Sequence, residues 1–193
     1  MLIAVVLLVG CAGDGGGGAS ESPEPTAVTT SSPVASPTPT TSPSPTVIPT
    51  YPSDLPTESA EEAAIIAGWQ EYWRVFEKFA ADPNGFTDFT ETQYVTTDEE
   101  SVGILESISS MRERGVRMVG GSVFRDVSIE VLEEGVAEVV YCADTTQMDV
   151  RYVESDEPYQ PDVADSYRET ATMREGKDGT WRVAKIRNEA ASC

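Results

Sequence analysis

Carboxylates are the only abundant acid–base groups in the sequence, which contains 33 Asp and Glu residues and no histidine. The lack of an imidazole removes the most common general base, the Ser-His and Cys-His nucleophile pairs and the commonest zinc ligand. Asp144 lies three residues after Tyr141, and burial can raise the pKa of an Asp until it is a useful base. An Asp in this place is more often a turn residue at the end of a strand. We therefore expect no catalytic residue.

Cys11 is the most informative of the three cysteines. The apolar run Leu2–Val9 before it is too short to cross a bilayer as a helix, which takes about 20 residues. Such a run is typical of an export signal, although no Lys or Arg precedes it, so the start codon stays open. The tetrad Leu8-Val9-Gly10-Cys11 resembles a lipobox. It predicts a signal peptide at residues 1–10 and a lipid such as palmitate on Cys11. The alternatives are a secretory signal with an incidental Cys and a short buried strand.

The other two cysteines are Cys142 and Cys193. If Cys11 carries a lipid, an even number of thiols remains in an exported protein. The outer side of a membrane is oxidising enough for disulfides to persist. We therefore predict a Cys142–Cys193 disulfide, the alternative being two unrelated thiols.

Residues 11–56 are rich in Gly, Ser, Thr and Pro, and the charged residues lie mainly after them. Proline removes backbone donors, and Gly and Ser supply little apolar surface for a core. The composition predicts a disordered linker that begins at the lipidated Cys11 and holds residues 57–193, a single domain, away from the membrane. Dense Ser and Thr beside Pro also suit O-glycosylation, which the sequence leaves open.

The formal net charge of -20 excludes a nucleic-acid partner, because such a chain repels phosphates. We expect no cofactor, since the glycine-rich GDGGGG segment lies in the linker rather than between a strand and a helix. The acidic stretch at residues 154–165 lacks the regular spacing of a calcium loop. We therefore expect no bound metal and interpret this stretch as a solvated loop.

Two amphipathic helices are predicted at the start of the domain. Residues 59–80 carry apolar side chains with the spacing of one helical face, and Ser59 with Glu62 forms a capping-box pattern. A second helix is predicted from Asp98 to about Arg114, capped by Thr97 and Glu100 and ended by Gly115. Its apolar stripe comprises Val102, Leu105, Ile108 and Met111.

After Gly115 the apolar period changes from 3.6 to 2. Strands are predicted at residues 127–133 and 136–142, which form a hairpin, and at 166–174 and 180–187, joined by a tight turn at 177–179. A short strand is possible at residues 148–153. Two helices followed by an antiparallel meander indicate an α+β domain in which the helices pack on one face of a curved sheet.

Three segments resemble a known family. They are Ala64-x-x-Ala-Gly-Trp-x-x-Tyr-Trp-x-x-Phe76, Tyr141-Cys-Ala-Asp-Thr145, and Trp181-Arg-Val183 with the final Cys193. In order and spacing they are similar to actinobacterial surface lipoproteins with a nuclear transport factor 2-like outer domain, the SnoaL-like or cystatin-like cone. The resemblance covers about residues 60–193. It implies a cone with a ligand pocket at its mouth, which Trp69, Tyr72, Trp73, Phe76, Tyr141 and Asp144 would line. The alternative is that the aromatic stripe packs as core.

We expect a membrane-anchored extracytoplasmic lipoprotein at the outer face of the cell membrane, with a non-catalytic domain that binds another envelope protein or a small apolar ligand. Relatives with the cone fold include isomerases and cyclases that use an Asp and a Tyr. The resemblance therefore implies one alternative, an enzyme of that kind using Asp144. A mobile-element-encoded surface exclusion protein is another, which gene neighbourhood would decide. A filled interior would favour the binding module and an open pocket the enzyme. The oligomeric state stays open, a dimer included.

Overall fold

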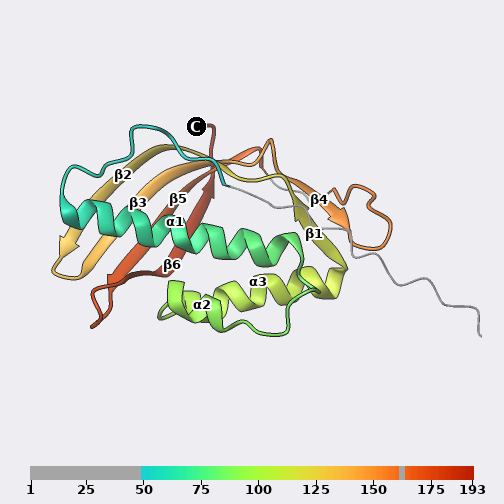
Figure 1. The fold of residues 1–193 in the computed structure, drawn as a ribbon. Helices are drawn as coiled ribbons and strands as arrows, with labels where there is room; N and C mark the ends of the chain where they lie inside the picture. Colours follow the sequence, from blue (N-terminus) through green and yellow to red (C-terminus); the bar gives the residue numbers. More distant parts are fainter. Residues whose placement is uncertain (1–48, 161–163) are drawn as a thin grey trace, which may run out of the picture. The chain divides into compact units, whose positions relative to one another are not determined.

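The computed structural model describes residues 49–160 and 164–193. Within them the domain is α+β, with helices packed on one face of a curved antiparallel sheet, as the sequence predicts (Figure 1). The predicted signal peptide, Cys11 and most of the predicted linker lie outside the described residues. None of the helices within the described ranges is long and apolar enough to cross a membrane.

The first helix, α1, spans Ala60–Ala81 and begins with the predicted capping box. The Ser59 hydroxyl accepts a hydrogen bond from the Glu62 N–H, and the Glu62 carboxylate accepts one from the Ser59 N–H at 2.8 Å. Its predicted apolar face is buried except at Phe76, which is half-buried. The other predicted residues are each at most 8 % exposed, and they are Ile65, Ile66, Trp69, Tyr72, Trp73 and Phe79.

Two further helices follow, α2 at Thr90–Val95 and α3 at Glu100–Arg114. α2 is not predicted, because six residues are too few for an apolar period to show. α3 ends at Gly115, whose φ of 64° is the left-handed conformation of a helix C-cap. The predicted stripe is partly wrong, since Val102 is 57 % exposed while Ile104 is fully buried. The buried face runs instead through Ile104, Ile108 and Met111, at spacings of four and three residues.

The predicted cap of α3 is also wrong. No side-chain hydrogen bond caps this helix, and Asp98 just before it takes a left-handed backbone conformation with a φ of 47°. The Glu100 carboxylate turns to the interior, where it accepts a hydrogen bond from the Tyr72 hydroxyl. Glu100 thus binds Tyr72 of another helix instead of capping the start of α3.

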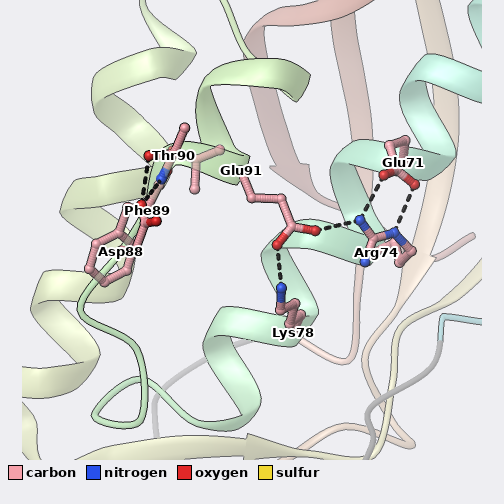
Figure 2. Close-up of polar contacts among 8 residues, drawn as sticks. Glu71, Arg74, Lys78, Asp88, Phe89, Thr90 and Glu91 are labelled. Atoms are coloured by element: carbon pink, nitrogen blue, oxygen red, sulfur yellow. Dashed lines mark hydrogen bonds and ion pairs between the residues drawn. The ribbon is translucent and has the colours of Figure 1, made fainter.

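Ion pairs join α2 to the exposed side of α1 (Figure 2). The Glu91 carboxylate binds both Arg74, at 2.6 Å, and Lys78. Arg74 in turn binds Glu71 at 2.7 Å, one turn earlier on α1. These side chains are 30 to 50 % exposed. Each pair therefore contributes well under about 1 kcal/mol, and the network orients α2 rather than holding the fold together.

The main sheet has four antiparallel strands in the order β2-β3-β5-β6. Their bounds are Val123–Glu133, Val136–Asp144, Ser166–Glu175 and Trp181–Ala190, which confirms the predicted hairpin and meander. A second sheet pairs β1, Val116–Val119, with β4, Asp149–Tyr152. The possible strand at 148–153 is therefore present, whereas β1 is not predicted. Register shifts in β2 and β6 mark bulges, which bend strands and help the sheet to curve.

Both ends of the described chain attach at one end of the main sheet. Thr50 forms a parallel bridge with Val123, and its carbonyl accepts the Phe124 N–H at 2.8 Å. A disulfide joins Cys142 to Cys193, as the cysteine parity predicts. Cys142 is the cross-strand partner of Arg125, two residues from the Thr50 bridge.

Candidate functional site

Polar side chains meet in the otherwise apolar interior, between the sheet and the helices. Tyr141 on β3 and Glu169 on β5 are direct cross-strand partners, so their side chains lie on the same face of the sheet. This is the face that the helices cover, and the two residues are only 1 % and 7 % exposed. Along β5 the neighbours of Glu169 on this face are Ala171 and Met173, both fully buried. Glu169 is thus a carboxylate whose neighbours on this face of β5 are apolar.

α1 supplies three aromatic residues from the opposite side of the interior. The Trp69 ring lies 4.9 Å from the Tyr141 ring, between centroids, and the Trp73 ring lies 6.2 Å from it. Tyr72 contacts Trp73 edge-on at 5.4 Å. The spacing of these residues along α1 places all three on one helical face. We call Trp69, Tyr72, Trp73, Glu100, Tyr141 and Glu169 the interior cluster.

Four polar atoms of the interior cluster are buried without a close hydrogen-bond partner among the described residues. They are both indole nitrogens, the Tyr141 hydroxyl and Oε2 of Glu169. Unpaired buried polar groups are costly, so their convergence in one place is unusual for a core. The Tyr141 hydroxyl nevertheless lies close enough to Glu169 and to both indoles for hydrogen bonding among them to influence its pKa.

The remaining two polar side chains of the cluster, Tyr72 and Glu100, are hydrogen-bonded to each other. The Tyr72 hydroxyl donates to Oε1 of Glu100 at 2.6 Å. Burial raises the pKa of Glu100, while the hydrogen bonds from Tyr72 and from the Ile186 backbone oppose that rise. Burial also raises the pKa of Tyr72, and the nearby Glu100 charge raises it further.

Glu169 is the most perturbed carboxylate of the cluster. Its pKa is raised to about 7, chiefly because burial disfavours the charged form. The Tyr141 hydroxyl close by lowers this pKa, and the nearby Glu100 charge raises it. Burial, followed by the Glu169 charge, raises the pKa of Tyr141. A carboxyl group that titrates near neutrality beside a phenol can accept and return a proton.

The structure brings together five of the six residues predicted for the pocket. Trp69, Tyr72, Trp73 and Tyr141 belong to the interior cluster, and the half-buried Phe76 stacks on Tyr72 with the ring centroids 6.4 Å apart. Packed aromatic rings surround Tyr141, as the core interpretation of the stripe expects.

Asp144 does not join them. It lies three residues from Tyr141 on the same strand, which places its side chain on the other face of the sheet. There it accepts hydrogen bonds from the Thr146 N–H at 2.9 Å and the Thr146 hydroxyl at 2.6 Å, and it pairs with Arg125. These Thr146 contacts lower its pKa, which is the reverse of what a base requires.

Glu169 and Glu100 are the members of the cluster that the sequence interpretation misses. Glu169 carries a visible signal, because strict alternation in the predicted strand at 166–174 puts it on the same face as Ala171 and Met173. Glu100 carries none, since it fits the expected role of a helix cap. Groups of three or more metal-binding side chains do not occur within the described residues.

No protein-family model matches the sequence, and no curated protein does either. Solved structures with similar folds include a ketosteroid isomerase-like protein from Erwinia carotovora atroseptica, at 16 % identity and a TM-score of 0.43, covering 70 % of this chain and 99 % of that one. Another is an uncharacterised protein with a cystatin-like fold from Caulobacter vibrioides, at 15 % identity and a TM-score of 0.44, covering 69 % and 92 %. Likenesses of this extent say nothing about substrate or site.

Proposed function

We propose that the chain is an extracytoplasmic lipoprotein whose nuclear transport factor 2-like domain is a non-catalytic binding module for an envelope protein or a small ligand. The observation that carries the non-catalytic part is the packed interior. Trp69 contacts Tyr51, Phe124 and Tyr141 at centroid distances of 5.3, 5.1 and 4.9 Å. Trp69, Phe124 and Tyr141 are each at most 1 % exposed. A catalyst for small molecules needs open volume at such a place.

The disulfide supports the extracytoplasmic part of the proposal. Disulfides persist in oxidising compartments and are rare in reducing ones. Cys142, itself only 2 % exposed, is joined to Cys193 near the end of the chain. This arrangement leaves Cys11 as the one remaining cysteine of the sequence, and the lipobox-like tetrad predicts a lipid on it.

Fractionation of a Cys11→Ser variant tests the anchor. The variant should leave the membrane fraction, because each buried CH₂ of an acyl chain contributes about 0.8 kcal/mol to membrane binding and the variant has no acyl chains. A Cys193→Ser variant is the matched control, since it also removes one cysteine and should stay in the membrane. A Cys11→Ser protein that remains membrane-bound would refute the proposed anchor.

A second candidate function is an isomerase-type or cyclase-type enzyme, and the Tyr141–Glu169 pair favours it. Here Glu169 would serve as the base in place of Asp144, with its pKa of about 7 suited to proton transfer. Ring opening of 5-nitrobenzisoxazole, a small substrate for general bases, separates the two functions. The binding module predicts no turnover above the rate in buffer. Turnover that is lost in Glu169→Gln and kept in Asp144→Asn would establish the enzyme instead.

A further inference from the structure

Three consecutive acidic residues hold the amino end of α3 against the rest of the domain. Asp98 pairs with Arg174 of β5 at 2.7 Å, and Glu99 pairs with Lys185 of β6 at 2.8 Å. Glu100 accepts the hydrogen bond from Tyr72 of α1. Glu100 also accepts a hydrogen bond from the Ile186 backbone of β6, so the three acids together bind α1, β5 and β6. The backbone adds one contact, since the Thr97 N–H donates to the Val183 carbonyl of β6 at 2.9 Å.

The ion pairs of Asp98 and Glu99 are more exposed to solvent than the hydrogen bond of Glu100. Asp98 and Glu99 are 53 % and 68 % exposed, and their partners Arg174 and Lys185 are 52 % and 42 % exposed. Ion pairs at such exposure contribute little and are screened by salt. Glu100 is half-buried and reaches inward to the interior cluster, where the Glu100 and Glu169 carboxyl groups are near enough for the charge of one to raise the pKa of the other.

The remainder of α3 is fixed much more firmly. Ile104 and Ile108 are fully buried in the main core, and Met111 is 9 % exposed. Before the helix, Asp98 has its left-handed φ of 47°, a conformation that a non-glycine residue adopts at some cost. Segments held by exposed polar contacts open at lower free energy than segments held by buried apolar ones. The first turn can therefore separate while the rest of α3 stays packed.

We propose that residues 97–100 form a latch, which opens locally and gives water and small uncharged molecules access to Tyr141 and Glu169. Opening separates Glu100 from Tyr72 and from the Ile186 backbone, and it moves the one half-buried member of the interior cluster away from Tyr141 and Glu169. Charged solutes are disfavoured, because the interior is apolar and a buried charge there would need a partner. The latch does not depend on either proposed function, since it concerns access and not what is bound or transformed.

The indole N–H signals of the three tryptophans allow a direct test by NMR on the full chain. Trp69 and Trp73 belong to the interior cluster, whereas Trp181 lies on β6 and packs against Gly68 of α1. An Asp98→Asn/Glu99→Gln variant removes the two exposed ion pairs. A Glu106→Gln/Glu113→Gln variant is the matched control, because it removes two exposed acids from the same helix. Hydrogen exchange of each indole and its broadening by TEMPOL, a small uncharged nitroxide, are measured in both.

The latch predicts that exchange at Trp69 and Trp73 accelerates roughly three- to tenfold in the Asp98→Asn/Glu99→Gln variant, the change expected from losing two exposed ion pairs. Their broadening by TEMPOL should rise too, while Trp181 and the control variant stay unchanged. A Glu100→Gln variant should act in the same direction. Equal acceleration at all three indoles would mean global opening and would overturn the proposal. So would unchanged exchange at Trp69 and Trp73, or faster exchange without broadening.

Discussion

At the residue scale, the most perturbed carboxyl group of the interior cluster is that of Glu169, because its surroundings disfavour the charged form. Glu169 is 7 % exposed, and the phenol of its cross-strand partner Tyr141 lies beside it. Asp144 is the opposite case, since hydrogen bonds from Thr146 favour its charged form. Two acids on adjacent strands therefore have pKa shifts of opposite sign, and the cause in each case is local.

The first prediction concerns Glu169 and pH. Because folding raises its pKa from 4.5 to about 7, Glu169 contributes stability below pH 4.5 that is lost as the pH rises through 7. A Glu169→Gln variant stays neutral at every pH. The difference in unfolding free energy between this variant and the wild type should therefore be about 2 to 3 kcal/mol larger, in favour of the variant, at pH 8 than at pH 5. Urea unfolding at both pH values measures this gain.

The Asp144→Asn variant is the control, because its expected effect on stability at pH 8 is opposite in sign to that of Glu169→Gln. Folding lowers the pKa of Asp144, so its contribution is present above the ordinary Asp pKa and is lost on acidification. Asp144→Asn should therefore be less stable than the wild type at pH 8. A difference in stability between Glu169→Gln and the wild type that does not vary with pH would show that folding does not raise the pKa of Glu169.

At the element scale, α1 is the part of the molecule that the sequence predicts best. Its apolar period and its capping residues Ser59 and Glu62 are both local signals, and both are confirmed. The strands β3 and β5 are predicted for the same reason, since alternation shows in the residues themselves. α2 and β1 escape prediction because each is too short to display a period.

The site is harder to predict than the elements, because it depends on register. The pairing of Tyr141 with Glu169 follows from how β3 and β5 align, which no local signal shows. The sequence instead joins Tyr141 to Asp144, which is near it in the chain and on the other face of the sheet. Glu100 is missed for a similar reason, since its partner Tyr72 lies 28 residues away.

The second prediction concerns the contact of α1 with β6. A Cβ atom on Gly68 would lie 2.3 Å from the carbonyl oxygen of Trp181. Because a backbone atom cannot move aside cheaply, Gly68→Ala should destabilise the domain by roughly 1 to 3 kcal/mol, although alanine favours helix by about 1 kcal/mol. Ala67→Gly on the exposed side of α1 is the control and should cost only that propensity difference. Thermal unfolding of both variants decides, and an unchanged or raised Tm for Gly68→Ala would contradict the predicted contact.

At the scale of the whole domain, both ends of the described chain are fixed near the same end of the main sheet. Thr50 pairs with the first residue of β2, and the disulfide joins Cys193 to Cys142 on the neighbouring strand. The packed aromatic core lies directly beneath, with Tyr51 stacked on Phe124 at 5.3 Å. The Thr50 bridge and the disulfide therefore both reinforce this end of the main sheet.

The third prediction concerns that cross-link. Cys142 and Cys193 are 51 residues apart in sequence, so reduction should lower the free energy of unfolding by about 4 kcal/mol in the chain-entropy description. Chemical unfolding with and without a reductant measures the change. A Cys142→Ala/Cys193→Ala variant should be insensitive to the reductant. If the wild type is equally insensitive, the two cysteines are not paired in the folded protein.

The central claim is that this domain is presented outside the cell by a lipid on Cys11. Mass spectrometry of the amino-terminal peptide, taken from protein purified out of the membrane fraction, tests it most directly. The account predicts that Cys11 is the first residue and carries a diacylglyceryl group on its sulfur. A peptide that retains residues 1–10 ahead of an unmodified Cys11 would contradict it.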